Sequence, residues 1–291
     1  MLRLVALAAI WGGSFLFIRV AAPVFGPGIL AELRAGLAAV FLWLVCRWLG
    51  RRRQLLANWK YFLKIGLFNS ALPFVFFAYA AQTLSASLMS ILNSAAPIFG
   101  ALLGALWLRQ PVSRSAALGL ACGVAGVVVL VGGGVAVRGE SWWGAVIAGL
   151  AAPLCYSIAS LMAKQSPSAL TPLDNAQGSM WAAALLVLPV ALFLPMQGEP
   201  RPLDWAAVAA LAVICTGVAY LIFFRLIQDV GPTQSLSVTF LIPVFGVLWG
   251  ALLLGEPVGW NTLAGGALVL CGTALANGVF RIGRGRPAVG G

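Results

Sequence analysis

The chain has no histidine, only seven acidic residues and five cysteines in 291 residues. Histidine and paired carboxylates are the usual parts of Ser-His-Asp chemistry and of proton relays. The cysteines lie singly inside apolar stretches, without the spacing of a metal site or of a disulfide framework. They are Cys46, Cys122, Cys155, Cys215 and Cys271. These absences argue against an enzyme, and they predict neither a metal ion nor a cofactor.

Charge is scarce as well: 9% of the residues are charged, 62% are apolar, and the mean hydropathy is +1.00. A soluble domain is about 25% charged and roughly 45–50% apolar. The composition therefore predicts an integral membrane protein in contact with the lipid bilayer. A net charge of +11 would suggest nucleic acid in a soluble protein, but in a membrane protein basic residues first mark the cytoplasmic face. No nucleic-acid partner is expected.

Ten apolar stretches are long enough to cross the hydrocarbon core, which takes about 20 helical residues. They cover residues 3–24, 28–48, 61–81, 85–107, 114–133, 142–163, 173–195, 204–227, 232–254 and 259–280. The first stretch follows Arg3 as a signal peptide would, but nine further spans come after it, so we interpret it as a membrane anchor. The sequence thus predicts an all-α membrane protein with ten transmembrane helices.

Basic residues fix the expected orientation. With the N-terminus in the cytoplasm, 14 of the 18 basic residues fall on the inner side. Those 14 are Arg3, Arg47, Arg51, Arg52, Arg53, Lys60, Lys64, Arg109, Arg114, Lys164, Arg225, Arg281, Arg284 and Arg286. Because lysine and arginine concentrate in cytoplasmic loops, we expect a multi-pass protein of a bacterial-type inner (plasma) membrane with both termini in the cytoplasm.

One segment of the chain occurs twice. Residues Pro97–Gly126 match Pro243–Gly272 without a gap at a constant offset of 146, with 13 identities in 30 positions that include two prolines and four glycines. The two halves, residues 1–137 and 138–291, would then hold five helices each. An odd number makes the copies insert upside down relative to one another, as in many secondary transporters, whose substrate site lies near the midplane between the copies. The predicted fold is two inverted five-helix repeats around a central cavity.

Three features together resemble a known family. They are the opening AIWGGSF of Ala9–Phe15, Arg34 early in the second helix, and the repeated Pro-x-Phe-Gly-x-Leu-x-Gly-Ala-Leu that precedes Gly-Glu-Pro-Val at 255–258. Over nearly the whole chain they resemble the EamA-type drug/metabolite transporter superfamily, and within it the YddG-like exporters of amino acids. The resemblance implies a ten-helix basket around a central cavity, with the fourth, fifth, ninth and tenth helices packed at the rear.

Polar and aromatic residues at mid-membrane depth are the candidate substrate-binding residues, because an unsatisfied polar side chain in hydrocarbon is costly and tends to face a cavity. Trp11, Ser14 and Phe15 share one face of the first helix by 3.6-residue periodicity, and Tyr156 and Ser160 share one face of the sixth. The predicted lining is Trp11, Ser14, Phe15, Asn69, Tyr79, Asn93, Tyr156, Ser160, Gln177 and Tyr220. For each residue alone, an interhelical hydrogen bond or core packing is the alternative.

Pro97 and Pro243 lie near the middle of their predicted helices, where proline removes a backbone hydrogen bond and kinks the helix. A kink shared by both copies suits a hinge or a cavity wall, and a static bend is the alternative. Two small-xxx-small patterns, which let helix backbones approach closely in lipid, are Gly100-x-x-x-Gly104 and Gly246-x-x-x-Gly250.

Glu32 and Arg34 lie toward the outer end of the second predicted helix, where we expect an electrostatic pair that acts as a gate or in coupling. Anchoring of the helix at the lipid headgroups is the alternative for Arg34. No carboxylate is placed near the bilayer centre, whereas a carrier that exchanges protons for lipophilic cations usually needs one. A neutral or zwitterionic substrate therefore fits better, held by amide, hydroxyl and aromatic groups and by a helix terminus for its carboxylate.

We therefore predict a secondary transporter that exports small metabolites, above all amino acids including aromatic ones, by alternating access. The alternative is a multidrug transporter that expels lipophilic cations in exchange for protons. The sequence leaves proton coupling and the oligomeric state open, and a monomer is compatible with it.

Overall fold

The computed structural model describes residues 2–50, 55–107, 114–132, 142–163, 167, 170–231 and 238–277, and these residues form helices and no strand. Seven helical stretches within these ranges are long and apolar enough to cross a membrane, and α12 and α13 are shorter apolar helices. The elements are α1 (Leu2–Trp48), α2 (Trp59–Gly66), the π-helix η1 (Leu67–Ala71), α3 (Leu72–Ala80), α4 (Ala86–Asn93), α5 (Ala96–Trp107), α6 (Arg114–Gly132), α7 (Trp142–Ala163), α8 (Pro172–Phe193), α9 (Pro202–Ala209), the π-helix η2 (Ala210–Val218), α10 (Ala219–Val230), α12 (Val238–Leu254) and α13 (Trp260–Ala276).

Each predicted span overlaps one of these helical elements. Their inverted relation and the division into halves stay predictions, and the boundary at 137/138, the turn at 109–113 and the C-terminal end beyond 277 lie outside the described residues.

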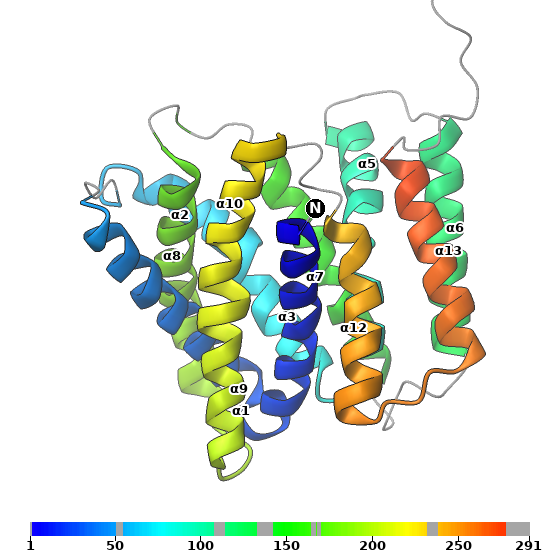
Figure 1. Ribbon diagram of the computed structural model, residues 1–291, viewed down its shortest axis with the longest axis horizontal. Coiled ribbons are helices and arrows are strands. Elements are labelled where there is room, and N and C mark those ends of the chain that lie inside the picture. The colour runs from blue at the N-terminus through cyan, green and yellow to red at the C-terminus, as the bar shows by residue number, and fades with distance from the viewer. Residues whose placement is uncertain are drawn as a thin grey trace, which may run out of the picture.

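Helix α1 is two helices joined at a sharp turn. Gly26 there has φ 70° and ψ 169°, a backbone conformation that a residue with a side chain rarely adopts. Pro23 and Pro27 flank it, and the turn is held by the backbone N–H of Gln197, which donates to the carbonyl of Val24 at 2.8 Å. The chain consequently reverses direction, as the dark blue ribbon shows in Figure 1. The first 48 residues therefore form two helices, as predicted, and their crossing the membrane as two spans stays a prediction.

Three spans that were expected to be continuous helices are interrupted. The π-helix η1 lies directly before Pro73, which lacks the N–H that an α-helix would offer to the carbonyl of Asn69. The π-helix η2 holds the hydroxyl of Thr216, which donates to the carbonyl of Leu211 at 2.9 Å and so enters the backbone ladder. The third interruption separates α4 from α5 at residues 94–95. The regular α-helix is thus widened at two points and broken at a third.

The carbonyls that the α4–α5 interruption exposes are satisfied by neighbouring helices. The hydroxyl of Thr273 donates to the carbonyl of Ser94 at 2.7 Å, and the hydroxyl of Ser157 donates to the carbonyl of Ala96 at 2.6 Å. An unsatisfied carbonyl in hydrocarbon is costly, so irregular backbone at membrane depth needs such partners. Residues of α13 and α7 thus fix the break in place.

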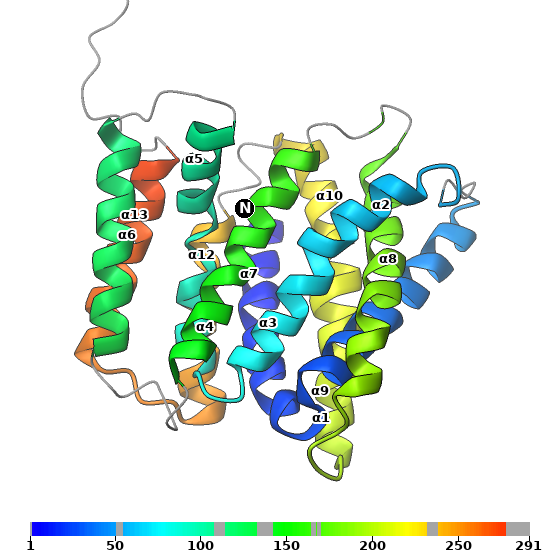
Figure 2. The ribbon, with the colours of Figure 1, turned by 180° about the vertical axis from the view of Figure 1, so that it is seen from behind.

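Glycines set the spacing between helices α6 and α13. These two helices lie side by side at one edge of the molecule in both views (Figures 1 and 2). A Cβ added at Gly272 would lie 2.5 Å from the carbonyl oxygen of Gly119, and a Cβ added at Gly126 would lie 2.8 Å from that of Gly265. In lipid such close backbone approach, rather than burial from water, is a main source of helix association.

The two small-xxx-small patterns behave differently. A Cβ added at Gly246 would lie 2.3 Å from Cβ of Ser90, so α12 and α4 pack closely there as expected. At Gly100, by contrast, an added Cβ would meet nothing within 4 Å, and the residue lines a cavity. The packing prediction is therefore confirmed at Gly246 and wrong at Gly100, where α5 faces open space instead of a helix.

Candidate functional site

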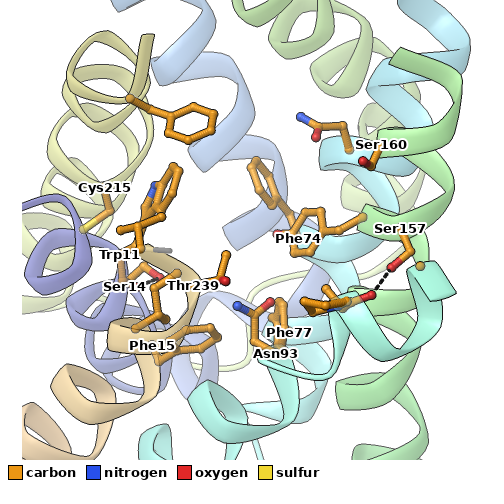
Figure 3. A pocket seen from close by; sticks show the side chains of 18 of the residues that line it. Trp11, Ser14, Phe15, Phe74, Phe77, Asn93, Ser157, Ser160, Cys215 and Thr239 are labelled. Carbon is orange, nitrogen blue, oxygen red and sulfur yellow. Dashed lines mark hydrogen bonds between the residues drawn. The ribbon is translucent and has the colours of Figure 1, made fainter. Parts of the chain in front are cut away.

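A cavity of about 530 Å³ lies between the helices and is shown from close by in Figure 3. Its size falls in the range of roughly 300–1,000 Å³ that is usual for small-molecule sites. Its lining comes from elements spread over the chain, from α1 to the end of α13. The lining residues are Trp11, Ser14, Phe15, Ile18, Arg34, Asn69, Phe74, Phe77, Asn93, Ala96, Pro97, Gly100, Ala101, Tyr156, Ser157, Ser160, Leu161, Cys215, Thr216, Tyr220, Phe223, Val238, Thr239, Ile242, Ala276 and Asn277.

Aromatic rings form much of the cavity wall. Trp11 contacts Phe223 with ring centroids 5.3 Å apart, and Phe15 meets Phe77 edge to face at 5.2 Å. Phe77 in turn lies 6.5 Å from the ring of Tyr156. In Figure 3 Trp11 is on the left of the cavity, whereas Phe15 and Phe77 lie together at its lower side. A flat apolar or aromatic group fits between such walls.

Amide and hydroxyl groups interrupt the aromatic wall. The amide of Asn69 donates to the hydroxyl of Tyr220 at 3.0 Å, which links η1 to α10 across the cavity. The hydroxyl of Ser14 is occupied locally, since it donates to the carbonyl of Trp11 at 2.6 Å. The side-chain oxygen Oδ1 of Asn93 is buried and has no hydrogen-bond partner among the described residues. Asn93 thus offers a vacant acceptor on the cavity wall.

Arg34 supplies the charge of the cavity. Its side chain is only 8% exposed, its Nε donates to the hydroxyl oxygen of Thr216 at 3.1 Å, and its guanidinium carbon lies 3.8 Å from the ring centre of Phe74. No ion pair of Arg34 occurs in the described ranges, and no Asp or Glu is among the lining residues found there. The cavity therefore presents one positive charge without a protein counter-charge.

The two ends of the cavity differ. Its lining reaches the ends of α7, α12 and α13, near Leu161, Val238 and Asn277, which the predicted topology places toward the cytoplasm. At the opposite side the carboxylate of Glu256 accepts hydrogen bonds from the N–H groups of Ala86 (2.7 Å) and Ser87 (3.0 Å). Arg19 there donates to the carbonyl of Ala81, and the amide of Gln82 donates to that of Gln197 at 2.9 Å. Polar contacts thus join the helix ends on the side away from the cavity mouth.

A family model described as the EamA-like transporter family matches residues 1–132 and 143–278. The chain belongs to the EamA-like transporter family.

Individual relatives of this EamA-like transporter match over nearly its whole length. It is similar to an uncharacterized transporter of Archaeoglobus fulgidus, at 28% identity over 279 residues that cover 90% of this chain and 92% of the relative. It is also similar to a probable terminal-alkyne amino-acid exporter of Streptantibioticus cattleyicolor, at 25% identity over 276 residues. These residues cover 94% of this chain and 92% of the relative. The fold is shared with a crystal structure of another protein, with a TM-score of 0.64 at 20% identity. The match covers 94% of this chain and 95% of the chain in that structure.

The structure brings together eight of the ten residues that the sequence predicts as cavity lining of the EamA-like transporter. They are Trp11, Ser14, Phe15, Asn69, Asn93, Tyr156, Ser160 and Tyr220. Their part in substrate binding stays a prediction. The convergence matters because they come from five helical elements that are far apart in the sequence.

Tyr79 and Gln177 do not line the cavity, so this part of the prediction is corrected. Tyr79 is 38% exposed on α3, about 200° around the helix from Phe77, which does face the cavity. Gln177 is buried on α8, which packs against α1 and α2 outside the ring of lining helices. Its Nε2 has no hydrogen-bond partner among the described residues. Gln177 therefore lies in a helix interface of this EamA-like transporter.

The expected Glu32–Arg34 ion pair is also corrected. Residues two apart on a helix point about 200° away from each other, and within the described ranges Arg34 contacts Thr216 and Phe74 while Oε2 of Glu32 has no hydrogen-bond partner. Arg34 lies on the cavity and Glu32 does not. A role of either residue in gating or coupling stays a prediction.

The two hinge candidates occupy different settings. Pro97 lines the cavity near the start of α5, directly after the break at 94–95, whereas Pro243 is buried inside the unbroken helix α12. The kink is therefore a break in one copy only. Whether either proline acts as a hinge stays a prediction.

Several lining residues escaped the sequence-based choice, above all Phe74, Phe77 and Thr216. A signal for Phe74 was present: the repeat offset of 146 pairs it with Tyr220, which was chosen. The same offset pairs Phe77 with Phe223, and both line the cavity. Applying the repeat to Tyr220 therefore predicts Phe74, whereas Phe77 and Thr216 have no partner in the predicted set.

Proposed function

We propose that the chain is an inner-membrane secondary transporter that exports small metabolites, above all amino acids including aromatic ones, by alternating access. The observation that carries this proposal is the cavity of about 530 Å³, with aromatic walls, a vacant amide acceptor at Asn93 and a buried guanidinium at Arg34. These are the groups that an aromatic side chain, an ammonium and a carboxylate would contact. The name of one relative, a probable terminal-alkyne amino-acid exporter, supports the same substrate class.

Alternating access in this proposal uses two halves, residues 1–137 and 138–291, in inverted orientation with both termini in the cytoplasm. The offset of the sequence repeat supports it, since η1 at Leu67–Ala71 shifted by 146 residues falls inside η2 at Ala210–Val218. Both π-helices contribute to the cavity wall through Asn69 and Thr216. Irregular helices at the substrate site of both repeats are common in secondary transporters.

Export is the proposed direction, and the two ends of the cavity fit the loading state of an exporter. An exporter loads its substrate from the cytoplasm, and the lining extends toward Leu161 and Asn277 on the side where we place the cytoplasm. The contacts of Glu256 with Ala86 and Ser87 would close the outer side in this conformation and open as the halves rock.

The test is uptake into proteoliposomes with labelled phenylalanine, labelled alanine and a labelled lipophilic cation, each with and without an imposed pH gradient. We expect saturable flux of the amino acids, reduced by Trp11→Ala and by Tyr220→Phe. Tyr61→Phe, which alters a ring outside the cavity, is the matched control and should transport as the unaltered protein does.

Cation flux driven by the pH gradient, without amino-acid flux, would overturn the proposal in favour of multidrug efflux. The structure gives an electrostatic reason to expect the opposite result. Arg34 would repel a lipophilic cation, and no carboxylate among the described lining residues would offset that repulsion.

A further inference from the structure

The guanidinium of Arg34 is a charge without a protein partner in a place where such a charge is costly. It lies on the cavity wall, more than nine-tenths buried, in a chain that spans a membrane. Charged side chains inside membrane proteins usually pair with one another or with backbone carbonyls, and they mark substrate pathways. A charge that lacks such a partner therefore suggests a ligand of opposite charge. The contacts with Phe74 and Thr216 are made to uncharged groups, so they reduce the cost but leave the charge uncompensated.

The geometry around Arg34 leaves its donors directed at the cavity. Phe74 covers a face of the guanidinium plane, at 3.8 Å from Cζ to the ring centre, and Thr216 takes the hydrogen bond of Nε. A stacked guanidinium keeps its edge available, and the hydrogen bond that Arg34 makes to Thr216 uses Nε alone. Two parallel N–H groups on that edge match the two oxygens of a carboxylate. Phe74 and Thr216 would fix the plane in which such a pair forms.

The cavity has no comparable partner for an ammonium group. Its described lining holds no Asp or Glu, and Oδ1 of Asn93 is a neutral acceptor. An ammonium that donates to this neutral amide meets no opposite charge, whereas a carboxylate on the guanidinium meets an opposite charge and two parallel N–H donors. The carboxylate end of a substrate is thus held by charge, and the amino end is held by a weaker and dispensable contact.

We propose that Arg34 is the carboxylate anchor of the cavity, and that the substrate class is carboxylates with an apolar or aromatic tail, with or without an α-amino group. This inference deepens the proposed function and rests on it for the identity of the site. The tail lies against the rings of Trp11 and Phe77, both of which line the cavity. Amines that lack the carboxylate are excluded because their charge faces the guanidinium without a compensating anion.

The experiment compares three ligands that differ by one group each: L-phenylalanine, 3-phenylpropanoate and 2-phenylethylamine. Their dissociation constants are measured at pH 7 by calorimetry on the purified full-length protein in nanodiscs. We expect the two carboxylates to bind within about tenfold of each other and the amine to bind at least about tenfold more weakly, as for loss of a charge-assisted pair. Equal binding of the amine and phenylalanine overturns the inference, whether or not a variant folds.

Variants separate anchoring from a merely structural role. Arg34→Gln should lower the affinity for both carboxylates at least about tenfold and abolish the preference for acid over amine, and Arg34→Lys should restore part of that preference. Arg225→Gln removes the same charge from an exposed site outside the cavity, paired with Asp229 at 3.5 Å, and should leave all three constants unchanged. An unchanged acid-to-amine ratio in Arg34→Gln overturns the inference.

The outcomes also distinguish this inference from the proposed function. Binding of 3-phenylpropanoate that depends on Arg34, without any flux of phenylalanine in proteoliposomes, supports the anchor and overturns amino-acid export. Phenylalanine flux that is unaffected by Arg34→Gln supports amino-acid export and overturns the role of Arg34 as the carboxylate anchor. Absence of binding for all three ligands overturns both.

Discussion

Replacing Gly272 by alanine should force helices α6 and α13 apart. The new Cβ would lie 2.5 Å from the carbonyl oxygen of Gly119, 2.8 Å from the backbone nitrogen of Gly123 and 3.2 Å from its Cα. An ordinary contact of this kind is 3.4 Å or longer. All three neighbours are backbone atoms, so no side-chain rotation can relieve the overlap, and the helices must separate by about 1 Å.

The size of the effect follows from two opposing terms. Overpacking of a tight interface destabilises by roughly 1–3 kcal/mol, while glycine to alanine in a helix gains about 0.5–1 kcal/mol. For a chain of this size each kcal/mol shifts the melting temperature by roughly 2–4 °C. We therefore expect Gly272→Ala to melt a few degrees lower, up to about 8 °C, at the large end of the overpacking range.

The control is Gly132→Ala on α6, where an added Cβ would meet no atom of the described residues within 4 Å. It should melt at the temperature of the unaltered protein or slightly higher. The assay is thermal unfolding in detergent followed by size-exclusion chromatography. If the two variants melt within a degree of each other, the packing argument fails. Helices α6 and α13 would then be farther apart than the distance of 2.5 Å between an added Cβ at Gly272 and the carbonyl oxygen of Gly119 requires.

Three further predictions concern the outer helix ends, the repeat and the topology. Glu256→Gln removes a charged acceptor from two N–H groups, so it should lower stability by roughly 1–3 kcal/mol in denaturant titrations, and an unchanged midpoint would contradict the bonds described. Gly246→Ala should destabilise the protein whereas Gly100→Ala should not, although the repeat makes them equivalent, and equal melting temperatures would refute this asymmetry. In a cysteine-free background an impermeant maleimide should label Val258→Cys in intact cells but not Leu56→Cys, both of which are exposed, and the reverse pattern would invert the proposed orientation.

The spans and the cavity were accessible from the sequence to different degrees. Hydropathy locates the spans because the thickness of the hydrocarbon core dictates their length. The 3.6-residue period finds the faces of regular helices, which is why Trp11, Ser14 and Phe15 were chosen correctly as neighbours on the cavity. Tyr79 was predicted from its polarity and depth alone, and on α3 it lies about 200° around the helix from Phe77, which faces the cavity.

The position of Arg34 was misjudged for a related reason. Its place early in the predicted span 28–48 suggested the outer end of a helix. The side chain is instead stacked on Phe74 and bonded to Thr216, two residues whose place in the cavity depends on tertiary packing. Composition revealed that few charges exist, but not which of them is buried. Only the contacts identify Arg34 as the charge of the cavity.

The two copies of the repeat have similar helices, but they differ in the side chains that line the cavity. At the offset of 146 residues Phe74 corresponds to Tyr220, and Arg34 corresponds to Met180, which is fully buried on α8 and carries no charge. The positive charge therefore belongs to one half alone, so a cavity built on a repeated frame has two unlike walls. A substrate with a charged end and an apolar end fits such a cavity in one orientation. In the proposed cycle the anchor moves with its own half, so the same contact with the carboxylate would have to persist as access switches from one side of the membrane to the other. Substitution of Arg34 should then impair loading and release together, rather than one of them.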